Sequence, residues 1–115
     1  MEIRFYKRDR TLMVMLNGDV DHHTAEQVRL KTEREYMIAG CKHILFDFSG
    51  VNFMDSSGIG MVIGRYKLAR SNGGKTVVSG LSRATDRIFE MSGLKKIIHC
   101  YVDAKEALDC LSQER

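Results

Sequence analysis

Short apolar runs alternate with longer amphipathic stretches along this chain of 115 residues. Two apolar runs open it, at residues 3–6 and 11–18, and the charged residues 7–10 between them predict a β-hairpin. Later apolar runs predict three further strands, at residues 43–48, 75–80 and 96–101. The run HILFDF at 43–48 is apolar on both faces at its centre, which predicts a buried strand.

Apolar residues at helical spacing predict four helices, at residues 21–40, 55–71, 82–93 and 103–111. Residues that favour helix N-caps precede each of them: Asp21 or Thr24, Asp55 or Ser56, Ser82, and Asp103. Gly40, Asn72-Gly73-Gly74 and Gly93 end the first three helices.

Each predicted helix has one stripe of residues that we expect to be buried. The stripes are Ala25, Val28, Thr32, Tyr36 and Ala39; Ile59, Val62, Ile63 and Tyr66; Ala84, Ile88 and Met91; and Ala104, Ala107, Leu108 and Leu111.

The predicted order is β-β-α-β-α-β-α-β-α. Strands that alternate with helices imply right-handed crossovers and a mostly parallel sheet. We therefore predict an α/β fold, a mostly parallel sheet with an N-terminal hairpin and about four helices packed on one face of it. The length fits one domain, residues 1–115.

Composition excludes several classes of protein. The net charge of +3 comes without a clustered basic run, which argues against nucleic-acid binding. No apolar run approaches the ~20 residues of a membrane span, and the charged start MEIRFYKRDR is unlike a signal peptide. Three cysteines without Cys-x-x-Cys spacing indicate neither a disulfide framework nor a zinc site. We expect a cytoplasmic protein with reduced thiols.

The stretch FMDSSGIGMVIGRYKLAR at residues 53–70 carries the strongest candidate chemistry. Gly58, Gly60 and Gly64 resemble a relaxed dinucleotide-binding pattern, but seven residues (49–55) separate them from the preceding strand, and no acidic residue follows at the required distance. The alternative is structural: Gly60 and Gly64 lie one turn apart and would let the helix approach the sheet closely.

Enzymatic and metal-binding interpretations are weaker. Asp-Ser-Ser-Gly lacks the glycine two residues before the nucleophile that a serine-hydrolase elbow requires. The adjacent His22 and His23 point in different directions at a helix start, and no second ligand pair completes a metal site. The residues therefore predict no metal and no cofactor.

Ser56 and Ser57 lie at the start of a predicted helix, where free backbone N–H groups and the helix dipole favour an anion. They also lie at the end of a parallel strand, the edge at which such sheets bind ligands. From the residues alone, two interpretations of Ser56 and Ser57 remain open: they belong to a helix cap with no further role, or they have a function.

The segments GDVDHHTAEQVR, ILFDFSGVNFMDSSGIGMVIGRYKLAR and FEMSGLKKII resemble, in this order, the STAS-domain anti-sigma factor antagonists. Within that family the chain is most similar to the sporulation antagonists that counteract the sigma-F anti-sigma factor. The resemblance covers nearly the whole chain. The extreme N-terminus and the last ten residues match least.

The resemblance implies a non-enzymatic protein that switches partners. Unphosphorylated members bind an anti-sigma factor that is also a serine kinase, and thereby release the sigma factor. The kinase then phosphorylates the first serine of Asp-Ser-Ser-Gly, here Ser56, and a serine phosphatase of the sporulation pathway reverses the modification. Further partner-binding positions implied here are Asp21, Asp55, Ser57, Gly58, Ile59 and Met61, of which Ile59 and Met61 are the apolar groups nearest Ser56. The rival interpretation is a domain of this fold that senses a small ligand or a nucleotide.

Overall fold

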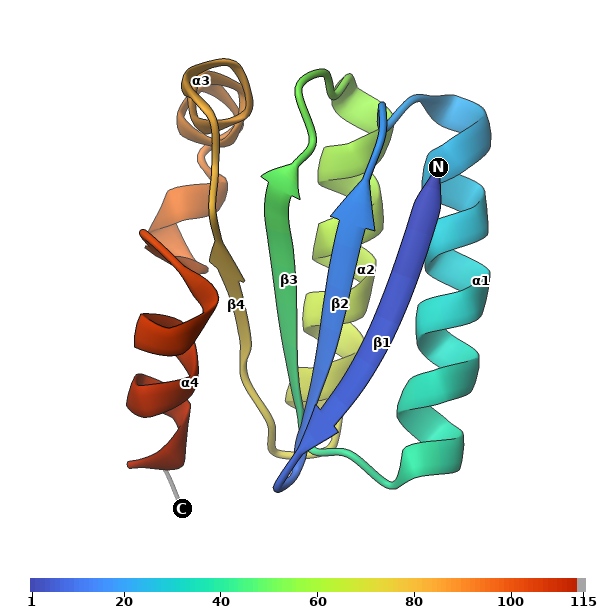
Figure 1. The fold of residues 1–115 in the computed structure, drawn as a ribbon, viewed down its shortest axis with the longest axis vertical. Coiled ribbons are helices and arrows are strands. Elements are labelled where there is room, and N and C mark those ends of the chain that lie inside the picture. The colour runs from blue at the N-terminus through green and yellow to red at the C-terminus, as the bar shows by residue number, and fades with distance from the viewer. Residues whose placement is uncertain (114–115) are drawn as a thin grey trace.

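A computed structural model describes residues 1–113 of the chain, and these form a five-stranded sheet with helices on both faces (Figure 1). The strands are β1 (Glu2–Arg8), β2 (Thr11–Asn17), β3 (His43–Gly50), β4 (Thr76–Ser79) and β5 (His99–Tyr101). The helices are α1 (His22–Ala39), α2 (Ser56–Ser71), α3 (Arg83–Ser92) and α4 (Ala104–Ser112), with a short 3-10 turn, η1 (Leu94–Lys96). Residues 114 and 115 of the predicted domain lie outside the described part.

The sheet has the predicted topology. Its strands lie in the order β1-β2-β3-β4-β5, with β1 antiparallel to β2 and every other neighbouring pair parallel. The hairpin is tighter than predicted, since Arg8 pairs with Thr11 and only Asp9 and Arg10 form the turn. Asp9 takes the left-handed conformation that this turn requires, with φ of 55°, which aspartate tolerates better than most residues.

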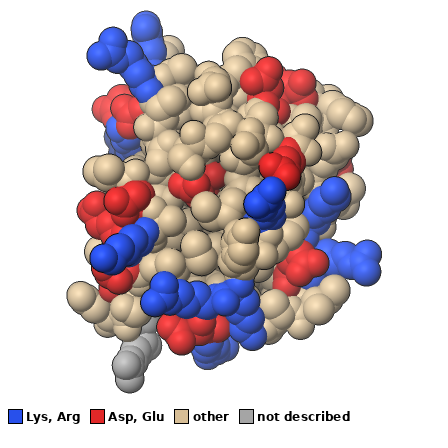
Figure 2. Space-filling model, viewed as in Figure 1, with Lys and Arg blue, Asp and Glu red and all other residues tan. Residues whose placement is uncertain are grey.

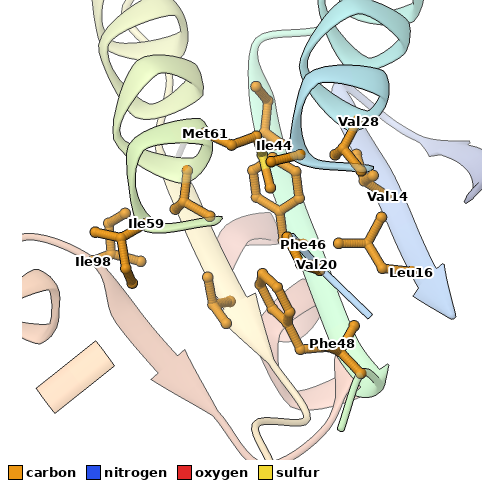
Figure 3. Close-up of a cluster of buried hydrophobic side chains, with 14 of the residues drawn as sticks. Val14, Leu16, Val20, Val28, Ile44, Phe46, Phe48, Ile59, Met61 and Ile98 are labelled. Atoms are coloured by element: carbon orange, nitrogen blue, oxygen red, sulfur yellow. The ribbon is translucent and has the colours of Figure 1, made fainter. Parts of the chain in front are cut away.

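A large core lies between the sheet and the helices α1, α2 and α3. It contains the alternate residues Val14 and Leu16 of β2 and Phe46 and Phe48 of β3, all at most 3% exposed. This alternation is the period of two that a strand imposes on its side chains. The apolar stripes predicted for α1 and α2 face this core (Figure 3).

Helix α4 corrects the prediction of a single helix-covered face. Its residues Ala107 and Leu111 pack against Leu45 and Val77 in a cluster separate from the main core. Helix α4 lies on the face of the sheet opposite to α1 and α2 (Figure 1). The central strand is apolar on both faces because each face has a helical layer of its own at this point. The predicted stripe of α4 is confirmed, with Ala104 and Leu108 half-buried at its margin.

The predicted stripe of α3 is partly wrong. Ile88 is half-buried, but Ala84 is exposed and Met91 is 76% exposed. Thr85 and Phe89 are the buried residues of this helix. The reason is the size of Phe89, whose ring packs edge-to-face on Phe48 with 5.6 Å between centroids and thereby sets the rotation of the helix.

The last predicted strand is also shorter than expected. Gly93 ends α3 in a left-handed conformation, and the backbone N–H of Ile98 then donates to the carbonyl of Leu94 at 3.0 Å. Leu94 and Ile98 are both buried, so the apolar run fills the core from a turn. Only residues from His99 onward pair with β4.

Within residues 1–113, no helix has the length and apolar content needed to cross a membrane, and no group of three or more His, Cys, Asp or Glu side chains is placed to hold a metal ion.

Candidate functional site

Two loops meet at the carboxyl end of the sheet, one between β2 and α1 and the other between β3 and α2 (Figure 1). The N–H of Val20 donates to the carbonyl of Phe53 at 2.9 Å, and the N–H of Asp55 donates to the carbonyl of Val20 at 3.0 Å. Val20 and Met54 thus form a single parallel bridge beyond the named strands. The Asp21 turn and the Asp55–Gly58 turn therefore lie at the same end of the sheet.

Asp55 is the N-cap of α2. Its carboxylate accepts a hydrogen bond of 2.8 Å from the N–H of Ser57, and its carbonyl accepts one of 3.0 Å from the N–H of Gly58. Of the two predicted caps, Asp55 therefore holds this position and Ser56 is the first residue of the helix. The aspartate satisfies amide groups that would otherwise lack partners at the helix start.

Ser56 is exposed, while Ser57 is half-buried. Among the described residues, no hydrogen bond occupies the Ser56 hydroxyl. Adjacent residues of a helix differ by about 100° in direction, so the two hydroxyls face different surroundings. Ser56 is the one available to another protein.

Asp21 is the N-cap of α1. Its carboxylate accepts from the N–H of Thr24 at 2.9 Å, and the Thr24 hydroxyl in turn accepts from the N–H of Asp21 at 2.9 Å, which closes a reciprocal capping box. Thr24, the other predicted cap, is thus its partner within the helix. The hydrogen bond from Thr24 lowers the pKa of the Asp21 carboxyl. Asp21 is exposed and carries a full negative charge at neutral pH.

Gly58 is buried and needed for packing. A Cβ atom at this position would lie 2.4 Å from both Cγ and Sδ of Met54 and 3.0 Å from Cγ1 of Val20. Protein atoms fill the space that a side chain would occupy, so the packing of α2 accounts for this glycine of the supposed dinucleotide pattern.

The prediction for Gly60 and Gly64 is wrong. A Cβ atom at either position would meet nothing within 4 Å, so neither glycine brings α2 close to the sheet. The close approach occurs at Gly58 instead, two residues before Gly60, where Met54 and Val20 of the bridge contact the helix.

Ile59 and Met61 do not present apolar surface beside Ser56. Ile59 is 9% exposed and Met61 is 5% exposed, and both belong to the main core (Figure 3). Helix α2 is covered by α1 as well as by the sheet, so more of its circumference is buried than one stripe would indicate. Any contribution of these two residues to a partner surface is indirect, through the position of the helix.

Phe53 is the apolar group that the sequence analysis missed. Its side chain is 51% exposed, although its carbonyl is fixed by Val20. The neighbouring Met54 is 1% exposed and fills the core. The sequence contained a signal for this exposure. In an extended segment, neighbouring side chains point to opposite sides, so Phe53 points outward if Met54 points inward.

The surroundings of Ser56 are acidic. Residues 11–28 and 43–64, which contain both loops, include none of the 18 Lys and Arg residues of the chain. Exposed Asp19 and Asp21 and half-buried Asp55 supply negative charge there. Figure 2 shows acidic side chains at the upper right, basic ones at the upper left on the side of α3, and a group of basic ones at the opposite end, where Arg8, Arg10 and Lys42 line a hollow of about 440 Å³.

Chemically, the site offers an accessible hydroxyl at the start of a helix, an exposed aromatic ring and several carboxylates. Such a surface suits recognition by a protein and modification of the hydroxyl. Adding a phosphate would bring about −1.5 to −2 charges to a region that is already negative.

Comparison with known proteins identifies relatives over almost the whole chain. Residues 2–107 match the family described as the STAS domain. The anti-sigma F factor antagonist of Paenibacillus polymyxa is 36% identical over 108 residues, which cover 94% of this chain and 92% of the relative.

Two solved structures share the fold. The structure of the anti-sigma factor antagonist SpoIIAA in its unphosphorylated form has a TM-score of 0.86, with 29% identity over 99% of each chain. The structure of the Bacillus cell fate determinant SpoIIAA in the phosphorylated form has a TM-score of 0.74, with 30% identity over 94% of this chain and 97% of that one.

Proposed function

The chain belongs to the STAS domain family, and we propose on that premise that it is an anti-sigma factor antagonist whose activity is controlled by phosphorylation of Ser56. The observation that carries the proposal is the position of Ser56. Ser56 is exposed and is the first residue of α2, and the N-cap of this helix is Asp55. The hydroxyl is therefore free for modification without loss of the cap.

In the unphosphorylated state the chain binds its anti-sigma factor through the edge that contains Ser56, and so releases the sigma factor. This function is a binding function, and we assign the chain no catalytic role, no cofactor and no metal. Its relative SpoIIAA is known in unphosphorylated and phosphorylated forms with the same fold, which supports a switch that leaves the domain folded.

Phosphorylation ends the interaction by changing the charge and shape of the surface. The phosphate adds about −1.5 to −2 charges at one point, close to the carboxylates of Asp55 and Asp21. The start of α2 tolerates the charge because the helix dipole favours anions there. The cost falls on the partner, which must accommodate a bulky dianion in its contact surface, and no rearrangement of this domain is required.

We propose two enzymatic partners for the switch. The anti-sigma factor is itself the serine kinase that modifies Ser56, and a serine phosphatase of the sporulation pathway restores the hydroxyl. These partners regulate transcription, so we place the protein in the cytoplasm. Residues 1–115 act as one STAS domain.

The test is to incubate the chain with the anti-sigma factor of the same organism and ATP, and to map phosphate on the tryptic peptides by mass spectrometry. We expect one phosphate, on Ser56. A Ser57→Ala variant should still take up one phosphate and a Ser56→Ala variant none. Phosphate on Ser57 alone would contradict the assignment, and absence of both binding and phosphorylation would contradict the proposed function.

A further inference from the structure

We infer that Phe53 is the apolar anchor by which the anti-sigma factor holds this chain, and that the partner receives it in an apolar pocket with a basic rim. The inference rests on the proposed function and extends it from the modified serine to the residue that supplies contact area. It starts from the exposure of the Phe53 side chain, which is 51% exposed, whereas the other large apolar side chains near Ser56, those of Ile59 and Met61, are buried.

The ring lies close to Ser56. Three residues of chain span at most about 11 Å, so one partner surface can contact Phe53 and Ser56 at the same time. The extended segment of residues 53–55 sends Met54 into the core, so Phe53 and the Asp55 side chain point outward, toward the surface on which α2 begins. A partner that covers Ser56 therefore also covers Phe53.

The backbone that carries the ring is fixed before binding. The carbonyl of Phe53 accepts from Val20 at 2.9 Å, the N–H of Asp55 donates to Val20 at 3.0 Å, and Met54 between them is almost completely buried. An aromatic side chain has only two rotatable bonds, so little conformational entropy is lost when a pocket encloses it. Large, pre-positioned aromatic groups are the residues that most often dominate the affinity of an interface.

The charges around the ring define the partner. Asp19, Asp21 and Asp55 supply negative charge in two loops that contain no Lys or Arg. Opposite charges across an interface speed association and fix orientation. The complementary surface is thus an apolar pocket for the phenyl ring, rimmed by Lys or Arg. The same basic rim brings the partner to these two acidic loops.

The experiment measures the affinity of the anti-sigma factor for the unaltered chain and for three variants by isothermal titration calorimetry. Phe53→Ala removes the anchor, Ser56→Asp imitates the modified state, and Ile38→Ala is the matched control. Ile38 is 69% exposed but lies 16 residues along α1 from His22, about 24 Å from the acidic end. Melting temperatures of all four proteins verify that they fold.

We expect Phe53→Ala to weaken binding by about 30-fold, with only a small decrease in melting temperature because half of the side chain is exposed, and Ile38→Ala to bind like the unaltered chain. Binding of the unaltered chain should also weaken as salt is raised, since the partner's rim is basic. If Ser56→Asp weakens binding while Phe53→Ala does not, the anchor is overturned and the proposed function stands. Salt-independent affinity would overturn the basic rim. If the unaltered chain does not bind, the proposed function fails, and this inference fails with it.

Discussion

The backbone N–H of Asp55 donates a 3.0 Å hydrogen bond to the carbonyl of Val20, which links the start of α2 to the start of α1. Val20 precedes Asp21, the N-cap of α1, and Asp55 is the N-cap of α2. The bond therefore holds two aspartate-capped helix starts side by side at the edge where Ser56 is exposed. Substitutions at this edge can separate what the arrangement contributes to stability from what it contributes to binding.

Replacing Asp21 with asparagine should separate its charge from its capping role. Asparagine caps a helix nearly as well as aspartate, so the Asp21→Asn variant should melt close to the unaltered chain at neutral pH. It should nevertheless be phosphorylated more slowly or bind the anti-sigma factor more weakly, because the charge beside the Ser56 loop is lost. Calorimetry and a phosphorylation time course measure the two effects. If the affinity and the phosphorylation rate of Asp21→Asn both equal those of the unaltered chain, Asp21 acts only as a helix cap.

The same variant should differ in its response to acid. The folded state lowers the pKa of Asp21 below its ordinary value of 3.8, so the carboxylate's contribution to stability is complete above that value and is lost as the pH falls through the lowered pKa. Below about pH 4 the unaltered chain should therefore lose stability more steeply than Asp21→Asn. Urea unfolding at a series of pH values measures the difference, and parallel curves would contradict it.

Substitutions at Ser56 should reproduce the two states of the proposed switch. Alanine removes only the hydroxyl, so Ser56→Ala should bind the anti-sigma factor permanently. Aspartate adds a charge to an acidic surface, so Ser56→Asp should bind weakly, although its carboxylate is smaller and less charged than a phosphate. Titration of the partner with each variant measures the affinities. Equal affinities would remove charge at this position from the mechanism.

Alanine at Gly58 and at Gly60 should have opposite consequences. A Cβ at Gly58 would lie 2.4 Å from two atoms of the buried Met54, so Gly58→Ala should destabilise the fold by about 1–3 kcal/mol. Gly60 is exposed and a Cβ there meets nothing, so Gly60→Ala should stabilise the helix by about 0.5–1 kcal/mol. Urea denaturation compares the two variants, and a stable Gly58→Ala protein would contradict the packing argument.

The buried guanidinium of Arg65 should make Glu33 important for stability. Arg65 on α2 is 7% exposed, and its Nη2 donates to Glu33 of α1 at 2.9 Å, while its Nε and Nη1 have no partner among the described residues. Burial lowers the pKa of Arg65, because a charge is disfavoured there. Glu33→Gln should destabilise the fold by about 2 kcal/mol, the loss of a hydrogen bond between charged groups.

Arg65→Met is the matched control for that pair. It removes the buried charge together with its unsatisfied donors and keeps most of the side-chain volume, so its free energy of unfolding should change by less than about 1.5 kcal/mol. In the Arg65→Met background, Glu33→Gln should change stability much less than it does alone, and the remaining effect should come from Arg29, whose Nη1 lies 3.6 Å from the same carboxylate oxygen. If Glu33→Gln is as stable as the unaltered chain, the ion pair contributes nothing to holding α1 against α2.

The types and order of the elements can be predicted from the sequence alone, because the signals for them are local. Period-two and helical spacing set strands and helices, Asp21, Asp55, Ser82 and Asp103 cap the helices, and Gly40 and Gly93 end two of them in the left-handed conformation. The motif Asp-Ser-Ser-Gly located the site for the same reason, since a cap and the residue after it are neighbours in the chain.

Which side chains of those elements are available to a partner depends on contacts between elements. Ile59 and Met61 are buried because α1 and the sheet together enclose α2, and α4 covers the opposite face because Leu45 and Val77 require a layer there. Gly58 is required by Met54 and Val20, and Phe53 is outward because Val20 fixes the segment on which it lies. These outcomes depend on contacts between residues some thirty positions apart, such as Val20 and Asp55. The spacing of residues within one segment carries no information about such contacts.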